Sequence, residues 1–81
     1  MQVEVLLFAA ARDLAGATQV LVELPEAPTV ADLRVALAQQ HLGLAPLIAS
    51  CRIAVDGDFA FDSQRIEQKK ELALIPPVSG G

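Results

Sequence analysis

The chain has 81 residues, of which 53% are hydrophobic, and six basic against ten acidic residues give it a net charge of −4 at pH 7. This length allows one domain with a single core, and the acidic balance with only three phenylalanines argues against nucleic acid as a partner. Because we find neither an apolar run long enough to cross a bilayer nor a secretory signal, we expect no membrane partner and a cytoplasmic location. The single cysteine, Cys51, fits a reducing compartment.

Two alternating segments near the N-terminus are predicted to be strands. Apolar residues recur at every second position in residues 2–9 and again in residues 18–24. Residues 10–16 between them are expected to be a connector that turns at Gly16. Two strands with a short connection predict an antiparallel hairpin.

The middle of the chain has the signals of a helix. Thr29 is expected to cap it, with Asp32 three residues later as the acidic member of a capping box. The main helix is predicted over residues 30–41, with Gly43 as its terminator, and Pro46 is expected to open a short helical turn that runs to Ser50. The predicted buried positions follow helical spacing and are Val30, Leu33, Leu37 and Leu44.

The last third of the chain predicts further strands. Residues 51–55 form the third, with Cys51, Ile53 and Val55 inward, and a tight turn at 56–57 leads to a short piece at 59–61. Residues 62–70 are expected to be a polar loop before a last strand at 72–75.

The resulting order, two strands, a helix and two strands, predicts an α+β domain with a β-grasp arrangement over residues 1–75. In it the first and last strands lie side by side and parallel, within a mixed sheet of four to five strands, and the main helix packs across one face. The uncovered face would then carry an apolar cluster, the predicted partner interface: Leu6, Phe8, Leu21 and Ile75. Two alternatives are that loops cover this face or that the inward and outward positions are exchanged.

Residues 76–81 are predicted to form an extended C-terminal tail. Pro76 and Pro77 have no amide hydrogen for a sheet and stiffen the start of the segment, whereas Val78, Ser79, Gly80 and Gly81 are small. Two terminal glycines leave the α-carboxylate accessible to an enclosing enzyme. The alternative is a frayed end without function.

The side chains offer little catalytic chemistry. His41 is expected at a helix C-terminus, Cys51 is expected to be buried, and Asp56, Asp58 and Asp62 lack the glutamate that closes a calcium loop, so no metal site is predicted. The remaining candidate is the carboxylate of Gly81, which becomes reactive if AMP is transferred to it from ATP and a sulfur nucleophile then displaces the AMP. The chain would carry a thiocarboxylate and have no catalytic machinery of its own.

Two motifs resemble a known family. Phe8-Ala9-x-x-Arg12-Asp13-x-x-Gly16 and the segment Pro76-Pro77-Val78-Ser79-Gly80-Gly81 are similar to the small, sulfur-carrying subunits of molybdopterin synthase. The resemblance implies a ubiquitin-like β-grasp fold and two partners, an E1-like adenylyltransferase that consumes ATP and the large synthase subunit. It also implies that Gly81 is adenylated and thiocarboxylated, that no cofactor is bound, and that sulfur passes to cyclic pyranopterin monophosphate during molybdenum cofactor biosynthesis.

The same resemblance places Gly80 beside the acyl donor, and Phe8 and Ile75 in the subunit interface. The chain departs from the family at Ile75, where relatives often have an aromatic residue, and at Asp13, where they often have glutamate. Three alternatives stay open: a sulfur carrier for thiamine, thionucleoside or cysteine synthesis, a ubiquitin-like protein modifier, and an inert interaction domain.

Overall fold

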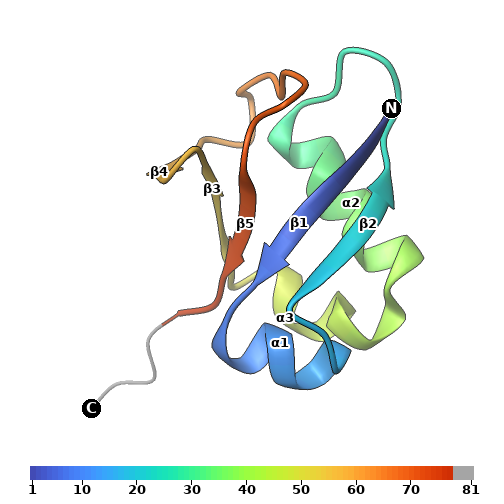
Figure 1. The fold of residues 1–81 in the computed structure, drawn as a ribbon, viewed down its shortest axis with the longest axis vertical. Coiled ribbons are helices and arrows are strands. Elements are labelled where there is room, and N and C mark those ends of the chain that lie inside the picture. Colours follow the sequence, from blue (N-terminus) through green and yellow to red (C-terminus); the bar gives the residue numbers. More distant parts are fainter. Residues whose placement is uncertain (78–81) are drawn as a thin grey trace.

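A five-stranded mixed sheet forms the body of the computed structural model, which describes residues 1–77 (Figure 1). Helix α2 lies across one face of the sheet, and α1 lies at the end where β1 finishes. In chain order the elements are β1 Gln2–Leu7, α1 Ala9–Ala15, β2 Gln19–Glu23, α2 Val30–Gln40, the 3₁₀ turn η1 Leu42–Leu44, α3 Ala45–Ile48, β3 Arg52–Val55, β4 Asp58–Phe59 and β5 Leu72–Ile75.

The strand order across the sheet is β2-β1-β5-β3-β4. Strand β1 pairs with β2 antiparallel and with β5 parallel, and β3 pairs antiparallel with both β5 and β4. The chain's first and last strands are therefore neighbours inside the sheet. This topology with α2 across one face is the β-grasp arrangement, and the predicted fold class is confirmed.

Helix α2 begins with the predicted capping box. The hydroxyl oxygen of Thr29 accepts a hydrogen bond from the Asp32 amide at 3.3 Å, and the Asp32 carboxylate accepts one from the Thr29 amide at 2.9 Å. Two amide groups that have no partner within the helix are thereby satisfied. The helix ends at Gln40 with His41 as its C-cap, so the prediction that Gly43 terminates it was wrong, since Gly43 lies in η1.

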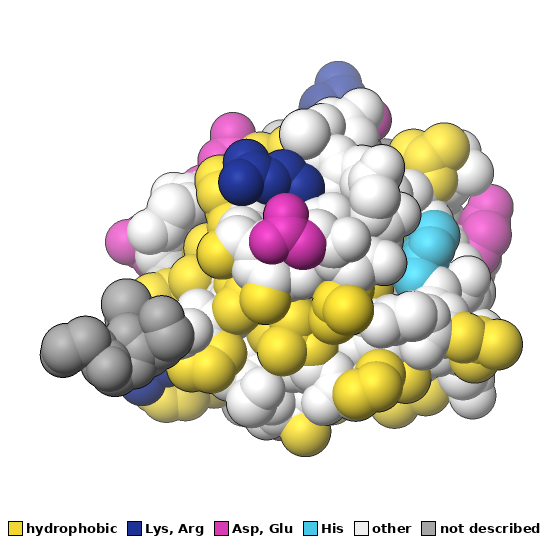
Figure 2. Space-filling model, turned by 90° about the horizontal axis from the view of Figure 1, so that it is seen from below, with side chains coloured by type: hydrophobic (Ala, Val, Ile, Leu, Met, Phe, Trp, Pro, Cys, Tyr) yellow, Lys and Arg dark blue, Asp and Glu magenta, His cyan; other side chains and the backbone are white. Residues whose placement is uncertain are grey.

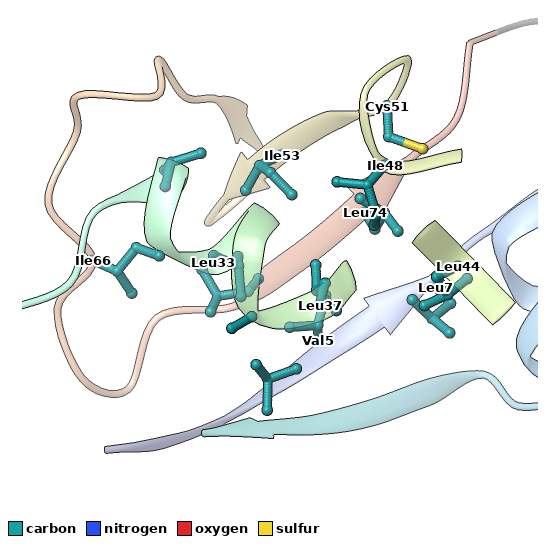
Figure 3. Packing of buried hydrophobic residues seen from close by; sticks show 14 of the residues in the cluster. Val5, Leu7, Leu33, Leu37, Leu44, Ile48, Cys51, Ile53, Ile66 and Leu74 are labelled. Atoms are coloured by element: carbon teal, nitrogen blue, oxygen red, sulfur yellow. The ribbon is translucent and has the colours of Figure 1, made fainter. Parts of the chain in front are cut away.

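The core lies between the sheet and the helices (Figure 3). Every second residue of β1 and β5 points toward α2, which contributes Leu33 and Leu37. Fully burying one such side chain contributes about 1.5–3 kcal/mol. The largest side chains that are less than 2% exposed include Val5, Val22, Val30, Leu33, Leu37, Leu44, Ile53, Leu72 and Leu74.

The segment predicted as a connector is a helix, α1, which corrects the sequence-based prediction. Its seven residues read Ala-Ala-Ala-Arg-Asp-Leu-Ala, and alanine has the highest helix propensity. It ends at Ala15, and its C-cap Gly16 has a left-handed φ of 67° that lets the Gly16 amide donate to the Arg12 carbonyl oxygen at 2.9 Å. Two turns with a single buried residue, Ala11, are too short to produce a hydrophobic period.

Two further predictions need correction after β3. The short fourth strand is Asp58–Phe59 rather than 59–61, and Phe61 is 83% exposed beyond it. The loop at 62–70 was predicted to be polar throughout, but Ile66 is buried and its amide donates to the Pro28 carbonyl oxygen at 2.8 Å. An apolar residue thus fastens the loop beside the start of α2. Within residues 1–77, no helix is both long and apolar enough to span a membrane.

Candidate functional site at the end of the sheet

Strand β5 determines where the C-terminal segment leaves the body. It occupies the third place of five in the sheet and runs parallel to β1, with Leu74 beside Leu7 in the register. Pro76 is half-buried and Pro77 is exposed directly after β5 ends at Ile75. Because proline has no amide hydrogen, the sheet ladder cannot continue through these two positions. The chain leaves at the end of the sheet where β1 also finishes (Figure 1).

Val78, Ser79, Gly80 and Gly81 lie outside the described residues. The predicted reactive group and four of the six predicted tail residues are therefore not placed by the structure. Pro76 and Pro77 are placed, and they fix the point from which this segment starts.

The face of the sheet opposite α2 has a shallow centre. The register aligns Leu6 of β1, Ala73 of β5, Ala54 of β3 and Phe59 of β4 across four neighbouring strands. Ala54 and Ala73 are each only 6% exposed, and this pair of short side chains lies between Leu6 and Phe59 in the register. We call this surface the outer face; its centre is small and apolar, and longer side chains surround it.

The structure places the four predicted interface residues on or beside the outer face. Leu6 and Ile75 are half-buried, and Leu21 is 54% exposed on the edge strand β2. Phe8 is 44% exposed and has extended backbone as the N-cap of α1, directly after the residue of β1 that pairs with β5. Their part in an interface stays a prediction.

The same end of the molecule carries further exposed apolar side chains. Seen from below, hydrophobic side chains gather over the lower half of the view, and basic and acidic side chains lie above them near its centre (Figure 2). Leu14 of α1 and Leu42 of η1 are 54% and 76% exposed. Such surfaces on small proteins often mark contacts with other molecules.

Sequence reasoning missed Arg52 and Phe59 as members of the outer face. The Arg52 guanidinium carbon lies 4.7 Å from the centre of the Phe59 ring, within the range of a cation–π interaction. Beside them is a groove of about 330 Å³, lined by Ser50, Arg52, Phe59, Ile75, Pro76 and Pro77. The alternation of residues 51–55 could have placed Arg52 on this face, because Arg52 lies between two inward positions and successive side chains of a strand point to opposite faces.

The other candidate groups have structural roles. His41 Nε2 lies 2.8 Å from the carbonyl oxygen of Leu21. Cys51 is a free, buried thiol, and burial raises its pKa more than the nearby Arg34 guanidinium lowers it. A thiol with a raised pKa is a poor nucleophile.

Two of the three aspartates predicted not to bind calcium, Asp56 and Asp62, have other partners. The Asp56 carboxylate accepts a hydrogen bond from the Glu71 amide at 2.7 Å and pairs with the Lys70 amine at 3.3 Å, and both contacts lower its pKa. Asp62 pairs with Arg34 at 2.8 Å. In the described part of the chain, no group of three or more His, Cys, Asp or Glu side chains could hold a metal ion.

Known proteins similar to this chain include relatives from eukaryotes and from an archaeon. The model of the ThiS family matches residues 5–81. The molybdopterin synthase sulfur carrier subunit of Drosophila yakuba is 38% identical over 84 residues, covering all of this chain and 92% of the relative, and that of Arabidopsis thaliana is 31% identical over 81 residues, covering 100% and 84%.

A solved structure agrees with these relatives. The crystal structure of SAMP1, the small archaeal modifier protein 1 of Haloferax volcanii, covers both chains completely with 30% identity and a TM-score of 0.85. The family match covers nearly the whole length, including the C-terminal glycines, and the relatives align over the full chain. This chain belongs to the ThiS family.

Proposed function

We propose that the chain is the sulfur carrier subunit of a molybdopterin synthase and that Gly81 is its acyl carrier. The observation that supports this most directly is the position of β5. It ends beside an apolar outer face, and two prolines then direct the chain out of the sheet. A partner that binds this face is adjacent to the start of the segment that ends in Gly80 and Gly81. We infer the pathway, molybdenum cofactor biosynthesis, from the relatives, which are named as molybdopterin synthase sulfur carrier subunits.

In the proposed cycle the body of the domain does not react. An E1-like adenylyltransferase transfers AMP from ATP to the Gly81 carboxylate and releases pyrophosphate. A sulfur nucleophile displaces AMP and leaves a thiocarboxylate, which then donates its sulfur to cyclic pyranopterin monophosphate in the large synthase subunit. In that step the sulfur atom bonds to a carbon of the substrate, and water then cleaves the thioester bond between the Gly81 acyl group and the sulfur, which leaves the sulfur on the substrate and returns the carboxylate. Two carriers are required for each product, because a dithiolene contains two sulfur atoms.

The side chains support a carrier rather than an enzyme. Cys51, the side chain best suited to sulfur chemistry, is buried, and burial raises the pKa of its thiol. His41 lies within hydrogen-bond distance of the Leu21 carbonyl oxygen of β2. We therefore propose that the chain binds no cofactor, that ATP is consumed by the activating enzyme, and that all steps occur in the cytoplasm.

Intact-mass spectrometry tests this proposal. The full chain is incubated with the activating enzyme, ATP and a sulfur source, and the expected product has one oxygen atom replaced by sulfur at the C-terminus. A variant without Gly80 and Gly81 is the control, and it should retain the circular dichroism spectrum and melting temperature of the full chain while gaining no sulfur. If the full chain gains no sulfur under conditions that convert an established carrier, the proposal is wrong.

The likeness to SAMP1 supports a second candidate, a protein modifier. The same activated carboxyl group would then be transferred to lysine amines of target proteins as an isopeptide. Immunoblotting of cell extracts distinguishes the two, because a modifier produces a ladder of heavier conjugates that disappears when Gly81 is deleted. A carrier produces only the free chain and its complex with the synthase.

A further inference from the structure

Arg52 is the charged residue in the lining of the groove at the root of the C-terminal segment, on the outer face. It is the cross-strand partner of Ile75, the last residue of β5, and both flank the groove that Pro76 and Pro77 help to form. Any protein that binds the chain around these prolines therefore comes close to the Arg52 guanidinium.

The guanidinium is held in place but has no ion-pair partner among residues 1–77. The ion pairs there join Arg34 with Asp62, Lys70 with Asp56, and the N-terminal amine with Glu23. Arg52 instead lies over the Phe59 ring at 4.7 Å. Stacking reduces the freedom of the long side chain, so less conformational entropy is lost when it binds a partner.

Covering the groove would remove water from this charge. The remaining lining consists of a serine, an isoleucine and two prolines, apart from the Phe59 ring, and no carboxylate is among them. A cation enclosed by an apolar interface is costly unless the opposing surface supplies an anion. A carboxylate is the side chain that matches the planar guanidinium with two parallel hydrogen bonds.

The charges of the outer face differ between its two sides. Glu4 of β1 and Glu23 of β2 lie on the other side of the small apolar centre, and the chain as a whole carries a charge of −4. Lys69 and Lys70 lie beside Glu4, and the N-terminal amine pairs with Glu23, so charges of both signs are present on that side. At the groove, in contrast, Arg52 is the charged residue of the lining, and a carboxylate of the partner is attracted there.

We propose that Arg52 is a specificity-determining contact that pairs with a carboxylate of the large synthase subunit when that subunit binds the outer face. This inference rests on the proposed function, because it names the partner that takes up the C-terminal segment. Phe59 acts as a positioning residue, since it holds the guanidinium without meeting the carboxylate itself.

Binding of full-length variants to the large subunit of the same organism tests the contact. Arg52→Leu should weaken the complex about 10-fold and Arg52→Glu about 100-fold or more, whereas Arg52→Lys should recover part of the affinity by keeping the charge. The affinity of the Arg52→Leu chain should also depend less on salt, since one ion pair is lost. Phe59→Leu, which removes the ring but keeps an apolar side chain, should give a smaller loss than Arg52→Glu.

Arg65→Leu is the matched control, because Arg65 is exposed in the loop that pairs with Thr29 at the start of α2. It removes the same charge and should bind as the unaltered chain does. Reversing individual acidic residues of the large subunit to arginine should restore binding of Arg52→Glu at one position. Circular dichroism establishes that each variant is folded, and Arg52→Met replaces any variant that is not.

Two results would overturn the inference. One is binding of Arg52→Glu within about 2-fold of the unaltered chain, and the other is an equal loss for Arg52→Leu and Arg65→Leu. Mass spectrometry of the same unaltered chain separates this from the proposed function. If Gly81 gains sulfur and the Arg52 variants bind normally, only the Arg52 contact is wrong; if Gly81 gains none, the proposed function is wrong.

Discussion

The side-chain amide of Gln40 pairs with the backbone of Glu23 on the free edge of β2. Its oxygen accepts from the Glu23 amide at 2.8 Å and its nitrogen donates to the Glu23 carbonyl oxygen at 2.8 Å. His41 occupies the next carbonyl group along this edge, that of Leu21, at 2.8 Å. The C-terminus of α2 thereby covers backbone groups that could otherwise pair with a strand of another molecule.

Gln40→Ala should uncover this edge. Because the two hydrogen bonds are exposed to water, we expect a loss of less than about 1 kcal/mol in the free energy of unfolding. The larger effect should be self-association at high concentration, measured by sedimentation velocity. Gln39→Ala, an exposed glutamine beside it, is the control and should stay monomeric. Equal association of both variants would contradict a protective role.

The capping box at the start of α2 should contribute measurably to stability. Thr29→Ala removes the hydroxyl group that accepts from the Asp32 amide, and losing such a cap costs about 1 kcal/mol. For a domain of this size the melting temperature should fall by about 4–8 °C for each kcal/mol. Scanning calorimetry measures the change, and Thr18→Ala, at an exposed position before β2, should leave it unaltered.

Asp56 should make stability depend on acid pH. Its pKa is lowered in the folded chain by the Glu71 amide and Lys70, so the unfolded chain binds the proton more tightly. The contribution is therefore complete at neutral pH and is lost as the pH falls below about 4, through the folded pKa. Asp56→Asn should lower the midpoint of urea unfolding at pH 7, and the difference should shrink toward pH 3. Asp58→Asn makes the same charge change nearby, and a parallel pH profile for both variants would refute the assignment to Asp56.

Ile75 and Leu21 allow the extent of the proposed interface to be measured. Ile75 lies beside Pro76 and the groove, whereas Leu21 lies on the edge strand β2, beyond β1. If the large subunit is centred on the root of the C-terminal segment, Ile75→Ala should weaken binding about 10-fold and Leu21→Ala clearly less. Isothermal titration calorimetry measures the affinity of both variants for the large subunit. A greater loss of affinity for Leu21→Ala than for Ile75→Ala would show that the interface is centred nearer to β2.

Elements with strong local signals could be predicted from the sequence. Alternation marked β1, β2 and β3, and an apolar run before two prolines marked β5. Thr29 with Asp32 marked the start of α2 at Val30, where it is observed. The outer face followed from the same alternation once the parallel pairing of β1 and β5 was assumed. These signals are local, so one sequence contains them.

The missed features depend on contacts between distant residues. Helix α1 is too short to show a hydrophobic period. Ile66 is buried where its amide donates a hydrogen bond to the carbonyl oxygen of Pro28, far earlier in the chain, and no local pattern reveals such a contact. Arg52 and Phe59 meet across the β3–β4 hairpin, whose second strand has only two residues. Cation–π contacts of this kind become visible only when the register is known.

The interior position of β5 affects how the chain folds during synthesis. Residues 72–75 are synthesised after the other four strands, yet they lie between β1 and β3, so the sheet cannot close while the ribosome still holds them. A prematurely terminated product that lacks this strand cannot complete the sheet, and it exposes the apolar residues that β5 would cover. Only a chain translated past residue 75 can therefore complete the sheet.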